Sequence, residues 1–335
     1  NSTLSGNSTI FGGGIANTGT LAIDNSEISG NTANIDGGGI HNTSGGIVTV
    51  SNSVISDNSA SDDGGGIHNF VDSTVTVINS TIVGNSANDN GGGIYSRGSA
   101  TVGNSTITGN TAGDDGGGIA VYTGATTISN SIVSGNTATD AGNELSSFGS
   151  GTVTVDGNNL LGSSESTFTE ALNGFTPGVS DIVATSDNSS SATHDPTALA
   201  NILEVDGQGD PLLQDNGGLT ETVALVSGSP AINAGDNANI SADVSDQDGD
   251  GDTAEDTPFD QRGTDFDRIG GSSVDIGAFE RQNIAPTITS AATANAAENQ
   301  TVAIDVDATD DSDTEGNGLT YSITDGDDAA LFSID

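Results

Sequence analysis

The chain of 335 residues contains no cysteine, methionine, tryptophan or lysine, and aromatic residues make up only 4% of it. The absence of cysteine excludes a disulfide framework, a thiolate metal site and a thiol nucleophile. No apolar run approaches the roughly 20 residues that a membrane-spanning helix needs, and no signal peptide is present. We therefore do not expect this segment to be embedded in a membrane.

Positive charge is scarce as well. The formal net charge is -43, and the only strong cations are four arginines. A surface this acidic repels nucleic acids and anionic membranes, so neither is expected as a partner. The same surface attracts divalent cations and favours solubility at high salt.

The sequence does contain a repeat that is rich in glycine and asparagine. Three glycines and an isoleucine occur at residues 12–15, 37–40, 64–67, 91–94 and 116–119. An Asn-Ser pair accompanies each of them, and successive pairs are 27, 27, 25 and 26 residues apart. A period of this size predicts a solenoid, whose coils must stack because no single repeat can bury its apolar side alone.

Each repeat has the pattern of short strands joined by tight turns. Apolar residues alternate before the Asn-Ser pair, as at Val48 and Val50, which is the period of a strand. Isoleucine, asparagine and alanine follow three, six and eight residues after the first Asn, as at Ile55, Asn58 and Ala60. Stacked in register about 4.8 Å apart, these positions form columns. The fold class that we predict is all-β, a right-handed parallel β-helix, with the hand given by the crossover rule.

The pair of motifs Gly-Gly-Gly-Ile-x-Asn and Ile-x-x-Asn resembles the repeats of polymorphic outer-membrane-protein β-helices. That family usually carries Phe where this chain has Ile28 and Ile55. Its members are large secreted or surface-displayed bacterial passengers, often adhesive. The resemblance implies an extracellular or cell-surface location on a bacterium. Because the repeat is already under way at Asn1 and the chain stops abruptly at Asp335, we expect a segment of a longer protein.

The chain divides into three predicted parts. Residues 1–162 carry the regular coils, and residues 163–281 are expected to form irregular coils and a cap that closes the solenoid. The second part is similar to the choice-of-anchor Q domain of bacterial surface β-helices. Five blocks carry this resemblance in order: residues 159–162, 210–218, 228–236, 260–263 and 274–280.

Residues 282–335 resemble part of a cadherin-like repeat, and alternating apolar residues predict a partial β-sandwich there. The resemblance implies calcium ligands at Glu298, Asp310 and Asp313. In that family such positions typically rigidify the junction between domains.

The acidic stretch of residues 246–252 is the sharpest candidate for chemistry. Asp246, Asp248 and Asp250 occupy positions one, three and five of a loop with glycine at position six, as in the first half of an EF-hand. Position twelve is Thr257, where an EF-hand has a bidentate Glu. A calcium site is predicted here, and an ordinary solvated loop is the alternative. The further residues able to complete the shell are Asp252, Glu255, Asp256 and Asp260.

Two columns of polar residues are predicted along the stack. Aspartates precede the glycines, at residues 36, 62, 63, 89, 114 and 115, and are expected either to splay into water or to share cations. His41, His68 and Tyr95 follow the repeated isoleucine on one face. They are either ordinary neighbours, or a sugar-binding surface or weak transition-metal pair. His194 lies in an irregular loop and has no evident partner.

We therefore expect a non-catalytic extracellular module: a rigid, acidic, calcium-associated β-helix acting as a stalk, adhesin or filament subunit. Its expected partners are other copies of itself, neighbouring surface proteins or glycans. The alternative is a polysaccharide-binding or polysaccharide-cleaving β-helix, a lyase or hydrolase. Catalysis is disfavoured because the coil acids recur with the repeat, whereas a hydrolase needs two carboxylates converging at one place.

Overall fold

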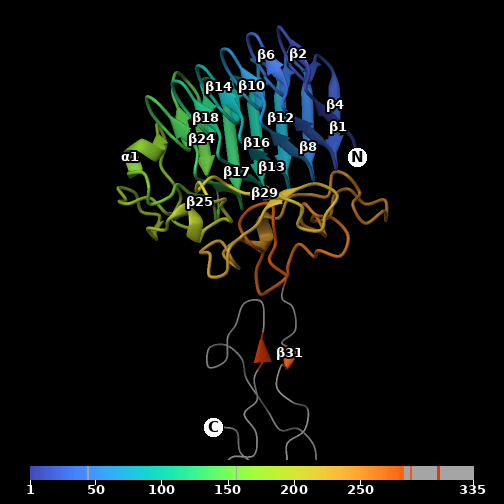
Figure 1. The fold of residues 1–335 in the computed structure, drawn as a ribbon, viewed down its shortest axis with the longest axis vertical. Helices are drawn as coiled ribbons and strands as arrows, with labels where there is room; N and C mark the ends of the chain where they lie inside the picture. Colours follow the sequence, from blue (N-terminus) through green and yellow to red (C-terminus); the bar gives the residue numbers. More distant parts are fainter. Residues whose placement is uncertain (44, 156, 283–286, 289–307, 310–335) are drawn as a thin grey trace, which may run out of the picture. The chain divides into compact units, whose positions relative to one another are not determined.

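The computed structural model describes residues 1–282 except 44 and 156, together with 287–288 and 308–309. Residues 1–282 form one compact unit and residues 283–335 a second. The first unit is built on a parallel β-solenoid, which confirms the predicted fold class (Figure 1). None of the helices in the described part of the chain is long and apolar enough to span a membrane.

Four parallel sheets run along the solenoid, and each regular coil, up to β24 (Thr152–Val155), contributes one strand to each of them. The isoleucine sheet contains β1 (Thr3–Ser5), β5 (Glu27–Ser29), β9 (Val54–Ser56), β13 (Thr81–Val83), β17 (Thr106–Thr108), β21 (Ile132–Val133), β25 (Leu160–Leu161), β27 (Ile182–Val183) and β28 (Thr193–His194). The alanine sheet contains β2 (Ser8–Thr9), β6 (Thr32–Ala33), β10 (Ser59–Ala60), β14 (Ser86–Ala87), β18 (Thr111–Ala112) and β22 (Thr137–Ala138).

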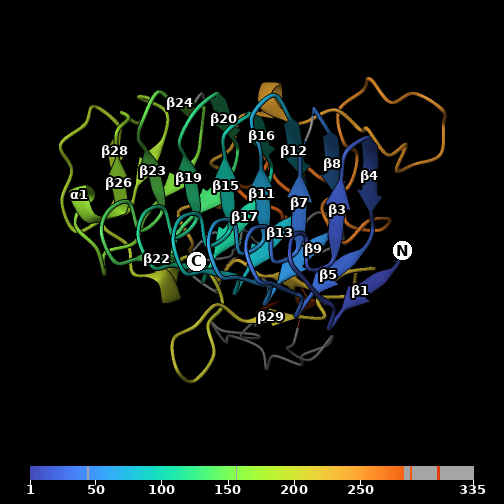
Figure 2. The ribbon, with the colours of Figure 1, turned by 90° about the horizontal axis from the view of Figure 1, so that it is seen from above.

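The other two sheets complete each coil, and Figure 2 shows their strands following one another along the stack. The histidine sheet contains β3 (Ile15–Asn17), β7 (Ile40–Asn42), β11 (Ile67–Asn69), β15 (Ile94–Ser96), β19 (Ile119–Val121), β23 (Leu145–Ser147) and β26 (Leu172–Asn173). The long-strand sheet contains β4 (Thr20–Asp24), β8 (Ile47–Ser51), β12 (Thr74–Ile78), β16 (Ser99–Gly103), β20 (Ala125–Ser129) and β24 (Thr152–Val155).

Equivalent side chains lie directly over one another. Ile40, Ile67 and Ile94 pair in register on neighbouring strands, and all three are fully buried. The second isoleucine column and the alanine column are in register too. Apolar residues from successive coils therefore make one continuous core, as the repeat predicted.

Three positions in the repeat have left-handed backbone geometry, and two of them explain its most regular residues. The third is the residue before the asparagine that lies six positions after each Asn-Ser corner, and it is glycine in most coils and Asp57 in one. The asparagine of each Asn-Ser pair has φ near +50°, a conformation that Asn tolerates better than most residues. The first of the three glycines also has positive φ, for example +70° at Gly64. The second has no room for a side chain, because a Cβ at Gly65 would overlap carbonyl oxygens of Ser86 and Gly92. Backbone approach at this corner therefore requires glycine.

An asparagine ladder runs inside the solenoid through one residue per coil. The Asn58 Nδ2 donates to Asn85 Oδ1 at 2.9 Å, and the Asn85 Nδ2 donates to the next asparagine at the same distance. The main-chain N–H of these residues also donates to the Oδ1 of the asparagine in the next coil. For Asn58, the distance to Asn85 Oδ1 is 3.0 Å. The ladder is made of Asn7, Asn31, Asn58, Asn85, Asn110 and Asn136. Between the two ends of the ladder, each Oδ1 accepts from the preceding coil, and each Nδ2 donates both to the next Oδ1 and to a main-chain carbonyl of the preceding coil, as Asn58 does to Ile28 at 2.8 Å.

Buried carboxylates accept the last donors of this ladder and of a parallel serine ladder. Glu144 accepts hydrogen bonds from the main-chain N–H and the Nδ2 of Asn136, at 3.0 and 2.7 Å. In the serine ladder each main-chain N–H donates to the Oγ of the next coil, and Asn159 and then Asp181 complete it. A buried donor left unpaired is costly, so each ladder requires a strong acceptor where the regular repeat stops.

After residue 162 the strands no longer follow the regular repeat. Strands β25, β27 and β28 extend the isoleucine sheet, and α1 (Phe168–Ala171) leads into β26 of the histidine sheet. A 3₁₀ helix, η1 (Leu199–Asn201), follows. The Glu170 carboxylate and the Thr167 main chain form a capping box at the start of α1.

Residues 204–282 lie along the side of the solenoid, next to its corner asparagines (Figure 1). This segment contains the antiparallel pair β29 (Leu213–Gln214) and β30 (Thr222–Val223), and η2 (Asn237–Asn239). Its hydrogen bonds reach successive coils: Ser245 contacts Asn52, Ser241 contacts Asn104, and Asp236 contacts Asn130. A cap that closed the solenoid would contact its last coil, whereas these bonds follow the length of the stack.

In the second unit the structure describes only β31 (Thr287–Ile288) and β32 (Ala308–Thr309), which pair antiparallel. The predicted calcium positions Glu298, Asp310 and Asp313 lie outside the described residues.

We predict that Asn85→Ala lowers the free energy of unfolding by about 3 kcal/mol, because it leaves the buried donors of Asn58 without an acceptor. Asn88→Ala is a matched control, since Asn88 lies exposed in the same coil, and it is expected to change stability by less than about 0.5 kcal/mol. Urea unfolding measures both variants. Equal effects would contradict a stabilising ladder.

A second prediction concerns pH. Burial raises the pKa of Glu144 to about 8, despite its hydrogen bonds to Asn136 and Gly135. The folded protein therefore holds a proton that the unfolded chain releases above its ordinary pKa near 4.5. Stability is expected to rise as pH falls from 8 to 5, with Glu144 contributing on the order of 3 kcal/mol. Glu144→Gln should flatten this dependence in thermal melts. A variant with an unchanged pH slope would contradict the assignment.

Candidate metal centres

The acidic loop of residues 246–252 brings three predicted ligands together. Carboxylate oxygens of Asp246, Asp248 and Asp250 lie within 4.8 Å of one another. The backbone turns sharply, with φ of +54° at Asp246 and +89° at Gly251, and the Gly251 N–H donates to Asp246 at 2.9 Å. Glycine at position six thus has the positive φ expected of a calcium loop.

A second group shares Asp248 and includes a residue that the sequence analysis missed. Carboxylate oxygens of Asp243, Asp248 and Glu255 also lie within 4.8 Å of one another. Asp243 is almost fully buried and accepts the Gln247 N–H at 2.6 Å, which fixes the base of the loop. Burial, followed by the like charges of Asp250 and Asp248, raises the pKa of Glu255. A divalent cation placed among these groups relieves that repulsion.

The other predicted ligands are placed elsewhere. Asp252 and Asp256 are exposed and are not part of either close group. Asp260 is fully buried in an ion pair with Arg262, at 2.6 Å, and also accepts the Glu280 N–H. Its other oxygen, Oδ1, accepts the main-chain N–H of Arg262 at 2.8 Å. Both oxygens are therefore engaged within the fold, so Asp260 does not complete the loop's ligand shell.

Two buried arginines hold the segment of residues 204–282 together. The Arg262 guanidinium lies between the rings of Phe266 and Phe279, 3.8 and 4.0 Å from their centroids. Arg268 donates to Asn79 Oδ1 at 2.9 Å and pairs with Glu280 at 3.4 Å. Arg268 thus links this segment to the corner asparagines of the solenoid. This network is structural, and it explains why arginine occurs here in so acidic a chain.

The aspartates before the glycines separate into two columns. Asp36, Asp63 and Asn90 form an inner, half-buried column in which each side chain accepts a main-chain N–H of the next coil. Asp62, Asp89 and Asp114 are exposed and form an outer column. Splaying into water, one of the two predicted outcomes, describes the outer column. Burial raises the pKa of Asp36 to about 6, and the charges of Asp63 and Asp62 add to that rise.

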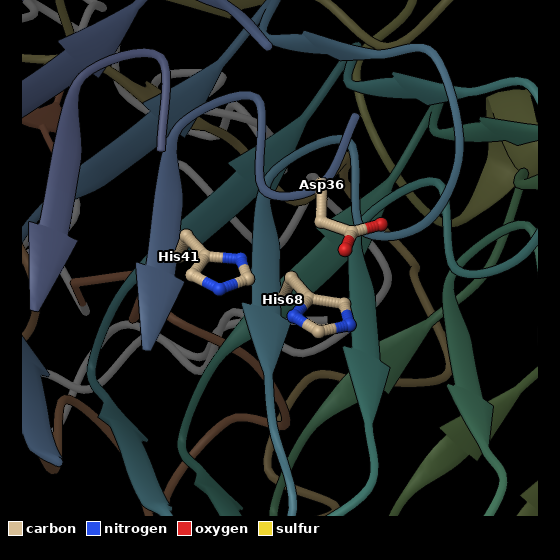
Figure 3. A group of neighbouring side chains, drawn as sticks. All are labelled: Asp36, His41 and His68. Atoms are coloured by element: carbon tan, nitrogen blue, oxygen red, sulfur yellow. The ribbon is translucent and has the colours of Figure 1, made fainter. Parts of the chain in front are cut away.

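A third group lies on the histidine sheet. The rings of His41 and His68 are stacked, 4.8 Å apart and 3° from parallel, and Tyr95 continues the stack at 5.3 Å. Figure 3 shows the two rings on neighbouring strands, with Asp36 on the turn beside them. One ligand atom from each of Asp36, His41 and His68 lies within 4.8 Å of the others. Burial lowers the pKa of both histidines, that of His68 to about 3.

His194 occupies β28, where its Nε2 lies 3.0 Å from the Thr185 carbonyl oxygen. The structure thus gives it a backbone partner that the sequence did not reveal. The repeat register is the signal that places His41 over His68, because the two residues occupy the same position in successive coils. Asp36 lies in the same coil as His41, on the tight turn before β7, so its place beside the histidines follows from the same register. In the sequence, Asp36 and the two histidines belong to separate predicted columns, and only the folded coil brings the three side chains together.

Comparison with known proteins supports a surface β-helix. Residues 52–69 and 79–97 match the Chlamydia polymorphic membrane protein repeat. Each match includes an Asn-Ser corner, a strand of the isoleucine sheet and the following glycines with a strand of the histidine sheet. The resemblance drawn from the two motifs is confirmed over these residues. No curated protein and no solved structure matches the chain.

The repeats and the solenoid together fit a surface-exposed, adhesin-like protein of a bacterial outer surface.

Proposed function

We propose that the chain is a non-catalytic extracellular module, a stiff acidic rod that presents an adhesive surface and binds calcium in the loop of residues 246–252. The observation that carries the proposal is the in-register stack itself. Each regular coil is hydrogen-bonded to its neighbours through four sheets and two internal ladders, so bending this part of the rod requires breaking several of these contacts together. A stalk, an adhesin and a filament subunit all need this mechanical property.

The distribution of acidic residues supports a scaffold. The coil aspartates recur at two adjacent positions of the repeat, and those of the inner column accept backbone hydrogen bonds. In the irregular region, Asp181 and Asp260 are likewise engaged in structural hydrogen bonds. A glycosidase instead needs two carboxylates about 5 to 10 Å apart on either side of a bound sugar.

Calcium is proposed because Asp246, Asp248 and Asp250 converge on a turn with the glycine geometry of a calcium loop. Asp243 and Glu255 supply a second set of oxygens through the shared Asp248. The loop is joined to the solenoid by Ser245 and Gln247, which hydrogen-bond Asn52. Calcium bound here would stiffen the segment that lies along the coils.

The test is a thermal melt with calcium and with chelator at matched ionic strength. With an affinity of about 10⁻⁴ M, typical of extracellular modules, 10 mM calcium stabilises the folded state by about 2.7 kcal/mol. We expect Tm to rise by about 5 °C or more, as such a change does in a domain of this size. Asp248→Asn should abolish the shift, because Asp248 belongs to both carboxylate groups.

Asp195→Asn provides a matched control, since Asp195 is an exposed aspartate outside both groups. This control should retain the full calcium shift. If Asp248→Asn retained it too, the stabilisation would come from general screening of the acidic surface, and the loop site would be rejected.

Glycan binding is a second candidate function, favoured by one surface feature. The Arg97 guanidinium lies over the rings of Phe70 and Tyr122, at 5.0 and 5.5 Å, and Tyr122 is 39% exposed. Aromatic rings beside an arginine suit a sugar that carries a carboxylate. A glycan-binding screen with Arg97→Gln as the comparison variant tests this candidate, and assays for released reducing sugar or unsaturated uronide test for cleavage.

A further inference from the structure

The histidine stack combines features that an ordinary stacked pair does not require. His41 and His68 are only 8% and 1% exposed, and the Nδ1 atom of each is buried without a hydrogen-bond partner among the described residues. A buried polar atom left unpaired costs about 1 to 3 kcal/mol. A phenylalanine or tyrosine would stack at these positions without that cost, as Tyr95 does in the next coil.

The carboxylate of Asp36 lies beside the two histidine rings. Asp36 is on the turn before β7, and its oxygen and one nitrogen from each ring lie within 4.8 Å of one another (Figure 3). The only hydrogen bond described for the Asp36 carboxylate is a long one, from the Asp63 N–H to Oδ1 at 3.3 Å. The inner aspartate column adds negative charge nearby, and no thiolate is available anywhere in the chain.

We propose that Asp36, His41 and His68 bind a divalent transition-metal ion of the Zn²⁺ type. Two imidazoles and one carboxylate form a common ligand set for such ions, and they leave a coordination position open to water or to a group on a partner. The site differs from the acidic loop, whose oxygen ligands suit calcium. It is independent of the calcium proposal and shares no residue with it.

The spacing of ligands around a zinc ion determines how far the three side chains must move to bind it. Ligands about 2.0 to 2.1 Å from a tetrahedral Zn²⁺ ion lie about 3.4 Å from one another. Because the three ligand atoms lie within 4.8 Å of one another, each separation needs to shorten by at most about 1.4 Å. Rotation of the rings and of the Asp36 side chain can supply this movement. The strands that carry the histidines are hydrogen-bonded in register and stay in place.

The test uses Zn²⁺ titration calorimetry and the Co²⁺ absorption spectrum of the full chain, with saturating calcium present to fill the carboxylate sites. His194→Gln serves as the background, because it removes the remaining histidine of the chain. We expect one Zn²⁺ ion per chain that calcium does not displace. Replacing both histidines of the stack by phenylalanine keeps an aromatic stack, and should weaken binding by about 100-fold or more.

Asp36→Asn is a second variant that leaves both rings in place, and we expect about tenfold weaker binding from it. Copper electron paramagnetic resonance supplies a readout that does not depend on folding of the variants, since nitrogen coupling reports imidazole ligands directly. Unchanged Zn²⁺ affinity in the folded phenylalanine variant would overturn the proposal. Displacement of Zn²⁺ by calcium, or a copper spectrum without nitrogen coupling, would do the same.

Discussion

Register between successive coils is the constraint on which the rest of this structure depends. A shift of one residue would turn every side chain of a strand to the opposite face. The isoleucine columns would then face solvent, and the amides of Asn58 and Asn85 would lose their partners. The apolar core and the internal ladders thus specify the same alignment of the coils. The core does so through the packing of its side chains, and the ladders through the direction of their hydrogen bonds. The repeat length varies between 25 and 27 residues because turns outside these columns absorb the difference.

Each hydrogen-bonded ladder requires an acceptor for its last donors, and the chain supplies one where the regular repeat is interrupted. Glu144 stands where earlier coils have the third glycine, as the pairing of Ile119 with Leu145 shows. Its side chain enters the interior and accepts the donors of Asn136. Asp181 does the equivalent for the serine ladder through Asn159. The departures from the repeat are therefore functional parts of the fold, since an acidic side chain is the strongest acceptor available to a row of aligned donors.

Most of the solenoid could be predicted because its information is periodic and local. Spacing fixed the columns of Ile40, Ile67 and Ile94, and turn residues marked the corners. The course of residues 204–282 could not be predicted, because its contacts join positions about 100 to 200 residues apart and follow no period, as with Arg268 and Asn79.

The acidic loop was found through its spacing, whereas Asp243 was missed because only the folded turn brings it to Asp248. Asp260 was wrongly expected at the loop, because its carboxylate pairs with Arg262 and also accepts the Glu280 N–H, a contact that only the folded segment makes.

The many carboxylates of this chain fall into two groups, according to whether aligned amides or a buried arginine lie next to them. Those that lie next to aligned amides or a buried arginine become structural acceptors, and their oxygens are part of the hydrogen bonding of the fold. The described arginines of residues 204–282 are mostly engaged in this way, so they leave few cations for the surface. The exposed carboxylates must then be balanced by ions from solvent, and geometry decides which ions are held. Alternating aspartates on a glycine turn offer oxygen ligands only, which is the basis of the calcium proposal, whereas the buried imidazoles beside Asp36 offer nitrogen, which is the basis of the zinc proposal. The two proposals assign different metals to two places on one acidic solenoid because the two ligand sets differ in chemistry.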